Sequence, residues 1–225
     1  MSTCWSATLT RVTPGEADAM VVAAVRAATG TVVASAALAW EDTYVSAVAL
    51  RNRLDPGPVA AEIAKAPNVS HVETRGPGLL AIHLAVPGEV AAAIGRDPRY
   101  GGGGRMGPGW PDLPRTFENP GFRVRFAHER ACAVVRRARD LGVPPGDLTA
   151  LDGESRLLGL LAGFEGHRKP VLQLERIADA YHDVYERSRE EPTPRHGARV
   201  VLAGAVRVTV SNGLARLGET ARERL

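Results

Sequence analysis

The amino-acid sequence predicts an α+β domain followed by an all-α helical bundle. Three observations support this fold class. Residues 1–96 mix helical and strand-like apolar patterns, and residues 117–225 keep apolar side chains at helical spacing throughout. Between them, residues 97–116 contain six glycines and four prolines and follow neither period. We therefore expect an N-terminal domain at 1–96, a linker at 97–116 and a helical domain at 117–225.

The N-terminal domain combines a few short helices with a small sheet. Apolar residues at helical spacing predict helices, and β-branched runs predict strands. The predicted elements are a helix at 15–28, a strand at 31–39, helical segments at 44–54 and 58–66, and strands at 69–74 and 79–84 around a turn at 75–78.

The Gly/Pro-rich segment at 97–116 is expected to be a linker that is flexible at its glycine run. Residues 102–107 spell G-x-G-x-x-G. No predicted strand leads into this motif, and prolines follow it where a helix would have to begin, so it predicts no dinucleotide site.

Each helix of the C-terminal half has recognisable start or stop signals. Asn119 and Pro120 have the N-cap and first-turn character of a helix that closes at Leu141–Gly142. Further helices are predicted at 154–161, 170–189 and 195–217, with Gly218 as the final stop.

Composition excludes several classes of protein. The chain has 225 residues, 44% of them apolar and 24% charged, which excludes a disordered chain. Cys4 and Cys132 are far apart, so the sequence predicts no disulfide framework and no metal site. It contains no cofactor-binding motif, so no cofactor is expected. No apolar run is long enough to span a membrane, and the first residues do not resemble a signal peptide. The expected location is the cytoplasm, without a membrane partner.

One segment concentrates positive charge. Residues 121–139 contain six arginines and a single acidic residue, Glu129. Arg123, Arg130 and Arg137 recur every seven residues and therefore share one helix face. Phenylalanines interleave with them, and phosphate neutralisation combined with aromatic stacking is how unpaired RNA bases are held. The alternative interpretation is an ordinary solvated helix face.

Three segments of the C-terminal half carry recognisable motifs: residues 119–122 with 126–130, the helix at 174–185 and the segment 211–218. Together they resemble the DALR anticodon-binding domain of the arginyl-tRNA synthetase family. Residues 44–50 and the Gly-Pro-Gly turn at 76–78 resemble its N-terminal domain.

The resemblance implies a tRNA-binding function without catalysis. Where the family has its catalytic domain, this chain has only the linker, and it has no HIGH-like or KMSK-like motif. We therefore expect no enzyme activity and predict a protein that binds the anticodon arm of a tRNA, with arginine tRNA as the first candidate. A tRNA-modifying enzyme or an enzyme that uses aminoacyl-tRNA would be its partner. The predicted RNA-binding residues are Arg75, Arg123, Arg125, Phe126, Arg130, Arg137 and Asn212.

Two other functions stay open at this point. The chain could be an interaction module that kept the fold and lost RNA binding. It could also be an enzyme acting on aminoacyl-tRNA through a new site, for which His128, Cys132 and His182 are the candidate residues.

Overall fold

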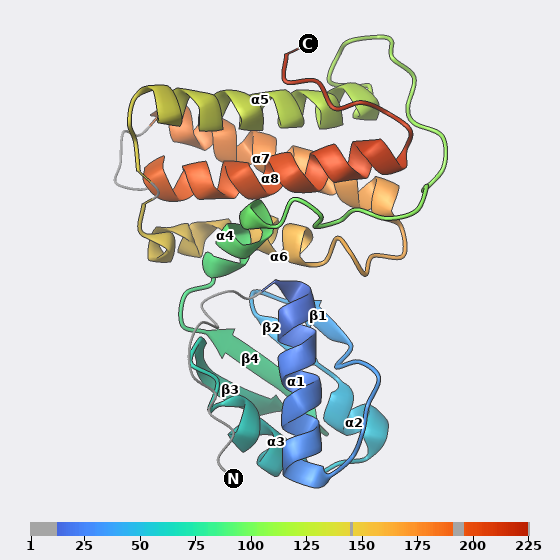
Figure 1. The fold of residues 1–225 in the computed structure, drawn as a ribbon, viewed down its shortest axis with the longest axis vertical. Coiled ribbons are helices and arrows are strands. Elements are labelled where there is room, and N and C mark those ends of the chain that lie inside the picture. Colours follow the sequence, from blue (N-terminus) through green and yellow to red (C-terminus); the bar gives the residue numbers. More distant parts are fainter. Residues whose placement is uncertain (1–12, 145, 191–195, 225) are drawn as a thin grey trace.

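A four-stranded antiparallel sheet with helices on one face builds the N-terminal part of the molecule, here called the sheet lobe (Figure 1). The computed structural model describes residues 13–144, 146–190 and 196–224. The strand order is β1-β2-β4-β3. The elements of this lobe are α1 (Pro14–Thr29), β1 (Leu38–Trp40), β2 (Tyr44–Ser46), α2 (Val48–Asn52), α3 (Pro56–Ile63), β3 (Val69–Arg75) and β4 (Leu79–Leu84).

Local sequence signals fix α1 against this sheet. Thr13 and Glu16 form a capping box, in which each side chain accepts a hydrogen bond from the other residue's backbone N–H. Gly30 ends the helix with φ +71°, a conformation that favours glycine. Val21 and Val25 of α1 are fully buried and belong to the same core as Leu80 and Ile82 of β4.

Two of the predictions for this lobe are wrong. The strand expected at 31–39 is confined to β1, because the Asp18 carboxylate accepts the Ala36 N–H at 2.8 Å and holds the preceding chain beside α1. The segment 44–54 begins as strand β2 and becomes helical only in α2. Pairing with β1 and β4 on both sides outweighs the local helical pattern there.

The helices that follow the sheet lobe, from residue 89 onward, form a second part of the molecule, here called the helical lobe. It begins earlier than the sequence indicates. Helix α4 (Glu89–Arg96), which was not predicted, packs along α8 (His196–Arg216), with Gly95 lying against the backbone of Ala205. The remaining elements are α5 (Pro120–Asp140), the 3₁₀ helix η1 (Leu148–Glu154), α6 (Ser155–Ala162), α7 (Pro170–Glu190) and α8 (His196–Arg216). The four helices predicted for this half are thus present with nearly the expected bounds.

The glycine- and proline-rich segment lies on the helical lobe (Figure 1). Tyr100 is buried, and its hydroxyl donates to the Leu161 carbonyl at 2.6 Å. Asn212 donates to the carbonyls of Pro98 and Tyr100, and the Arg216 Nε donates to that of Gly104. The expected flexible glycine run is therefore tied to α8 by hydrogen bonds, whereas the predicted domain bounds stay predictions.

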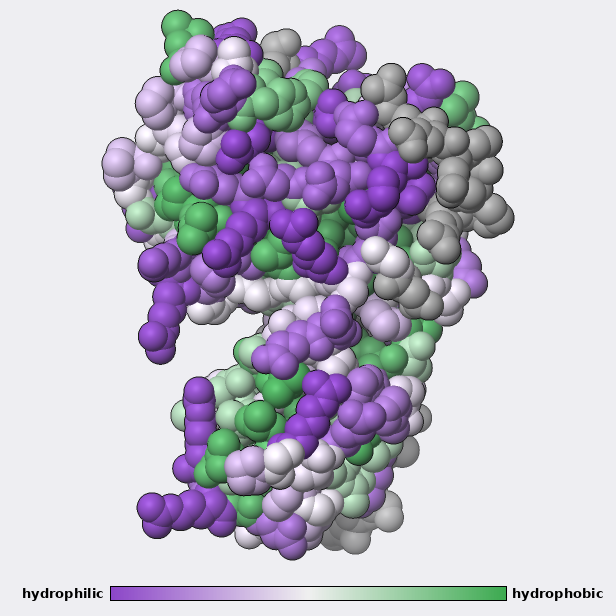
Figure 2. Space-filling model, turned by 180° about the vertical axis from the view of Figure 1, so that it is seen from behind, coloured by the Kyte–Doolittle hydropathy of each residue, from purple (hydrophilic) through white to green (hydrophobic). Residues whose placement is uncertain are grey.

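The two lobes meet through β1 and α6. Trp40 packs onto Gly159, where a Cβ would lie 2.2 Å from the indole, and Ser155 donates to the Asp42 carboxylate at 2.7 Å. A hollow remains between the lobes (Figure 2), and its walls include Asp18 and His167. Among the described residues, no helix combines the length and apolar character needed to cross a membrane.

Candidate nucleic-acid interface

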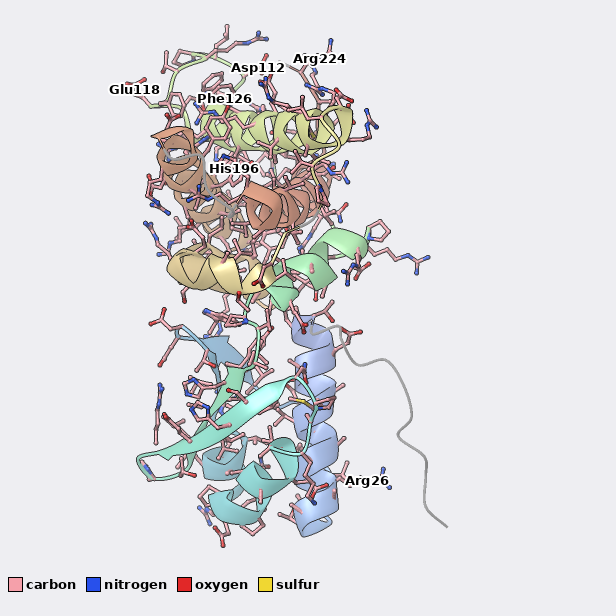
Figure 3. The ribbon with its side chains drawn as sticks, turned by 90° about the vertical axis from the view of Figure 1, so that its left-hand side faces the viewer. Arg26, Asp112, Glu118, Phe126, His196 and Arg224 are labelled. Atoms are coloured by element: carbon pink, nitrogen blue, oxygen red, sulfur yellow. The ribbon has the colours of Figure 1, made fainter. Side chains whose placement is uncertain are left out.

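Three phenylalanines gather at the start of α5. Phe122 and Phe126 are stacked with ring centroids 5.5 Å apart and planes 16° apart. Phe117, from the preceding loop, lies edge-on to both at 5.8 and 5.7 Å and is 46% exposed. This group, called the α5 aromatic cluster below, presents partly exposed rings at the end of the molecule farthest from the sheet lobe (Figure 3).

Two arginines flank the aromatic cluster and pair with acidic residues of α7. The Arg130 guanidinium lies 4.5 Å from the centroid of Phe126 and 4.4 Å from that of Tyr185. It also contacts the Glu186 carboxylate at 3.0 Å. Arg123 contacts Asp179 at 3.0 Å. The predicted arginine face therefore exists, but α7 balances part of its charge.

His182 of α7 connects these two arginines. Its Nδ1 lies 3.2 Å from Arg130 Nη1, which can only donate, so Nδ1 accepts. Its Nε2 therefore carries the proton and donates to the Arg123 carbonyl at 3.1 Å. Burial lowers the pKa of His182 below its usual 6.5, and the nearby Arg130 charge acts in the same direction. The neutral imidazole is the form that fits this site.

This arrangement predicts a loss of stability on acidification. Because the folded-state pKa of His182 lies below the unfolded value of 6.5, its contribution is complete above that pH. The contribution is lost as the pH falls from 6.5 towards the folded-state pKa. The free energy of unfolding, measured by urea denaturation between about pH 7 and pH 5, should decrease less steeply in His182→Gln than in the unchanged protein. Equal slopes in the two proteins would contradict this role of His182.

Two of the predicted RNA-binding residues hold the Gly/Pro-rich segment in place. Arg125 makes a two-pronged ion pair with Glu219, at 2.8 and 3.0 Å, and donates to the Trp110 carbonyl at 3.1 Å. Asn212 makes the two bonds to this segment described above. Both side chains are therefore engaged within the protein.

The other two predicted arginines lie apart from the aromatic cluster. Arg137 is exposed further along α5 and has no ion-pair partner among the described residues. Arg75 is on the sheet lobe, at the end of β3, and contacts Glu73 at 3.4 Å. The structure thus brings together Arg123, Phe126 and Arg130, with Arg137 on the same helix, and does not bring Arg75 to them.

The candidate catalytic residues are divided between two places. His128 donates from Nδ1 to the Arg222 carbonyl at 3.0 Å, and its Nε2 lies 3.6 Å from Cys132 Sγ. Burial lowers the pKa of His128 and raises that of Cys132. Burial therefore favours the protonated thiol, which is a poor nucleophile. His182 is on the α7 side of α5, in the hydrogen-bonded position already described.

The residues that complete this surface were not predicted from the sequence. Phe117 lies in the segment before the helix, outside any periodic pattern, and the acidic partners Asp179 and Glu186 are on α7. Their spacing of seven residues matches that of Arg123 and Arg130, and this matching charge pattern was a signal for two parallel helix faces in contact.

The known proteins that are similar to this chain include two called arginine–tRNA ligase. The one from Frankia alni is 33% identical over 133 residues, and the one from Clavibacter sepedonicus is 39% identical over 132 residues. Each match covers 49% of this chain and 24% of the relative, so the chain spans about a quarter of the length of these relatives. No family model and no solved structure matches the chain. About half of the chain is therefore arginyl-tRNA synthetase-like.

Proposed function

We propose that this protein is a noncatalytic tRNA-binding protein whose helical lobe holds the anticodon arm of an arginine tRNA. In this proposal, a tRNA-modifying enzyme or an enzyme that uses aminoacyl-tRNA receives the bound tRNA. The similarity of half the chain to arginine–tRNA ligases supports a tRNA-related function. The relatives' remaining length has no counterpart in this match, which is consistent with the loss of the catalytic part.

The α5 aromatic cluster is the observation that carries the proposal. Unpaired bases of an RNA loop stack on exposed aromatic rings, and each stacked base contributes about 1–3 kcal/mol. Phe117 offers an exposed ring, and Phe126 has the Arg130 guanidinium over its face. Arg123 and Arg130 would contact the neighbouring phosphates, and Arg137 would extend this contact along α5.

The ion pairs to α7 do not prevent such contacts. The side chains of Asp179 and Glu186 are 45% and 52% exposed. Arg123 and Arg130 are only 26% and 17% exposed, but a phosphate would keep each guanidinium paired while water solvates the released carboxylate. Arg125 has a largely buried carboxylate partner, and we propose for it a structural role instead.

A tRNA titration at two salt concentrations tests the proposal. We expect the protein to bind an arginine tRNA transcript with an affinity that falls steeply as salt rises, because phosphate contacts release counterions. The double change Arg123→Ala and Arg130→Ala should weaken binding by roughly 10-fold or more at low salt and reduce the salt slope by roughly 2. The matched control is Arg26→Ala with Arg51→Ala, two exposed arginines of the sheet lobe, of which Arg26 is at the opposite end of the molecule (Figure 3).

Absence of tRNA binding at low salt would refute the proposal. Equal affinity in the two double variants would refute the placement on α5. Preference for arginine tRNA is tested by the same titration with a second tRNA species.

A protein-interaction module is the second candidate function. The observation in its favour is that Arg123, Arg125 and Arg130 each have an acidic partner within the protein. In a protein that has lost RNA binding, these arginines would serve only to pair with acidic residues of the same chain. Stable self-association in the absence of tRNA binding would support this candidate over the first.

A further inference from the structure

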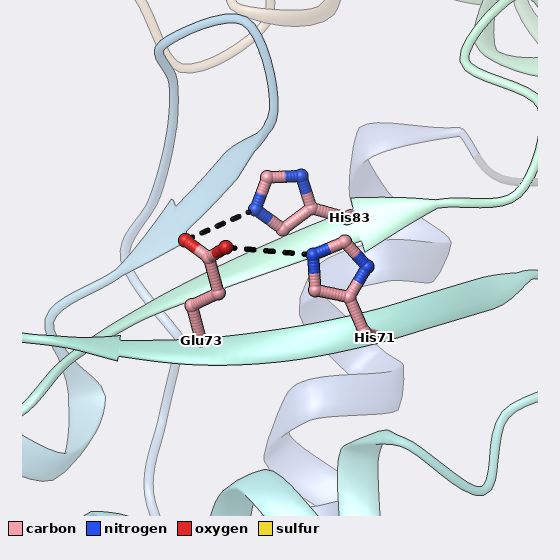
Figure 4. Close-up of side chains that lie close together, drawn as sticks. All are labelled: His71, Glu73 and His83. Atoms are coloured by element: carbon pink, nitrogen blue, oxygen red, sulfur yellow. Dashed lines mark ion pairs between the residues drawn. The ribbon is translucent and has the colours of Figure 1, made fainter.

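Three side chains with metal-binding atoms converge on the sheet lobe. His71 of β3 is directly opposite His83 of β4 in the antiparallel register, and Glu73 follows two residues further along β3. Alternate residues of a strand share one face, so all three project from the same side of the sheet. Figure 4 shows them on the side facing away from α1.

The distances within this cluster are too long for good hydrogen bonds. His71 Nε2 lies 3.5 Å from Glu73 Oε1, and His83 Nε2 lies 3.5 Å from Glu73 Oε2. Hydrogen bonds between nitrogen and oxygen are usually about 2.7–3.2 Å long. His83 Nε2 is shielded from solvent and has no hydrogen-bond partner among the described residues.

The same distances suit ligands around one metal ion. Zinc bonds of about 2.0–2.1 Å in a tetrahedron place neighbouring ligand atoms about 3.3–3.4 Å apart. The ligand atoms of all three residues lie within 4.8 Å of one another. The strand ladder fixes the backbone of His71 and His83, so only side-chain rotations are needed to close the site.

We propose that His71, Glu73 and His83 bind a divalent transition-metal ion such as Zn²⁺. Two imidazoles and one carboxylate are a donor set that zinc takes with three protein ligands and a water in the fourth position. Magnesium and calcium prefer sets made of oxygen atoms, so the two histidines favour a transition metal. The proposal is independent of tRNA binding.

Two neighbouring groups bear on the site. The Ser70 hydroxyl lies 3.1 Å from His71 Nδ1, which orients the ring and leaves Nε2 for the metal, as is common for metal-binding histidines. Arg75 Nη2 is 3.4 Å from Glu73 Oε2 and would be displaced by the ion. The two imidazole rings are stacked 5° from parallel, so binding requires them to tilt until both lone pairs point at one ion.

Zinc titration of the untagged 225-residue chain against a chelating dye tests this site. We expect the unchanged protein to bind one Zn²⁺ ion at the cluster and Mg²⁺ at equal concentration not to compete. His83→Ala and Glu73→Gln should each weaken zinc binding by at least about 10-fold, since loss of a mere supporting group already costs about 10–100-fold. His167→Ala is the matched control, because this histidine lies outside the cluster.

The variants separate loss of binding from loss of folding. Glu73 is half-exposed and His83 is partly exposed, so circular dichroism of both variants should equal that of the unchanged protein. Failure of the unchanged protein to bind zinc would overturn the proposal. An unchanged zinc affinity in folded His83→Ala or Glu73→Gln would overturn it as well.

Discussion

Replacing Gly197 by alanine should destabilise the helical lobe by about 3 kcal/mol, a large effect for one methyl group. Gly197 is in the first turn of α8, where the backbone of Gly146 passes against it. A Cβ on Gly197 would lie 2.5 Å from Gly146 N and 2.8 Å from the Pro144 carbonyl oxygen. Both neighbours are backbone atoms, which no side-chain rotation can move. The first turn of α8 would therefore have to separate from the chain that leads to η1.

Gly204→Ala is the matched control for this substitution. Gly204 is in the middle of the same helix, and a Cβ there meets no atom within 4 Å. Alanine has the higher helix propensity, so this variant should be more stable by up to about 1 kcal/mol. Urea denaturation followed by circular dichroism measures both. The close contact would not be the cause if the two variants unfolded at the same urea concentration.

The contrast between these glycines shows what local sequence can predict. The four helices of the C-terminal half were found because each has its own apolar stripe and its own end signals, such as Asn119 at the start of α5. Gly197 and Gly204 are equivalent in such a pattern. Only the tertiary approach of Gly146 distinguishes them.

Strand β2 illustrates the same limit in the sheet lobe. Its three residues, Tyr44–Ser46, are all buried, and they were predicted as the start of a helix. A strand this short is defined by its partners β1 and β4, which lie before and after it in the chain. Helix α4 is a different case, because its local signals were present and were overlooked: alanine has the highest helix propensity, Glu89 is in the first turn and Arg96 is in the last.

The candidate sites show the same limit: a group of residues on one element can be predicted from the sequence, whereas a contact between two elements cannot. The spacing of Arg123 and Arg130 on one helix predicted a shared face, and both contact the α5 aromatic cluster, Arg130 at the Phe126 ring and Arg123 at the Phe117 carbonyl. The acidic partners of these arginines lie on a second helix, α7. The cluster of His71, Glu73 and His83 likewise requires two strands, β3 and β4. A single-strand pattern such as His-x-Glu becomes a candidate site only when the register adds a third ligand from β4.

The second large effect is expected at Glu154, the last residue of η1. Its side chain is 6% exposed, and its carboxylate contacts Arg187 of α7 at 2.8 Å and Arg199 of α8 at 3.6 Å. Arg199 is itself only 11% exposed, and its Nε and Nη1 have no hydrogen-bond partner among the described residues. Glu154→Ala would leave this buried charge without a counter-ion, at a cost of about 3 kcal/mol.

An exposed ion pair between α6 and α7 provides the control. Arg156 of α6 and Asp183 of α7 are 3.6 Å apart and 70% and 60% exposed, so water already solvates both charges. Asp183→Ala should therefore change the free energy of unfolding by no more than about 0.5 kcal/mol. Glu154→Gln keeps the size of the side chain and an oxygen acceptor, so its effect should fall between those of the two alanine variants. If urea denaturation gave equal losses for Glu154→Ala and Asp183→Ala, burial of the Arg199 charge would not be what makes Glu154 important.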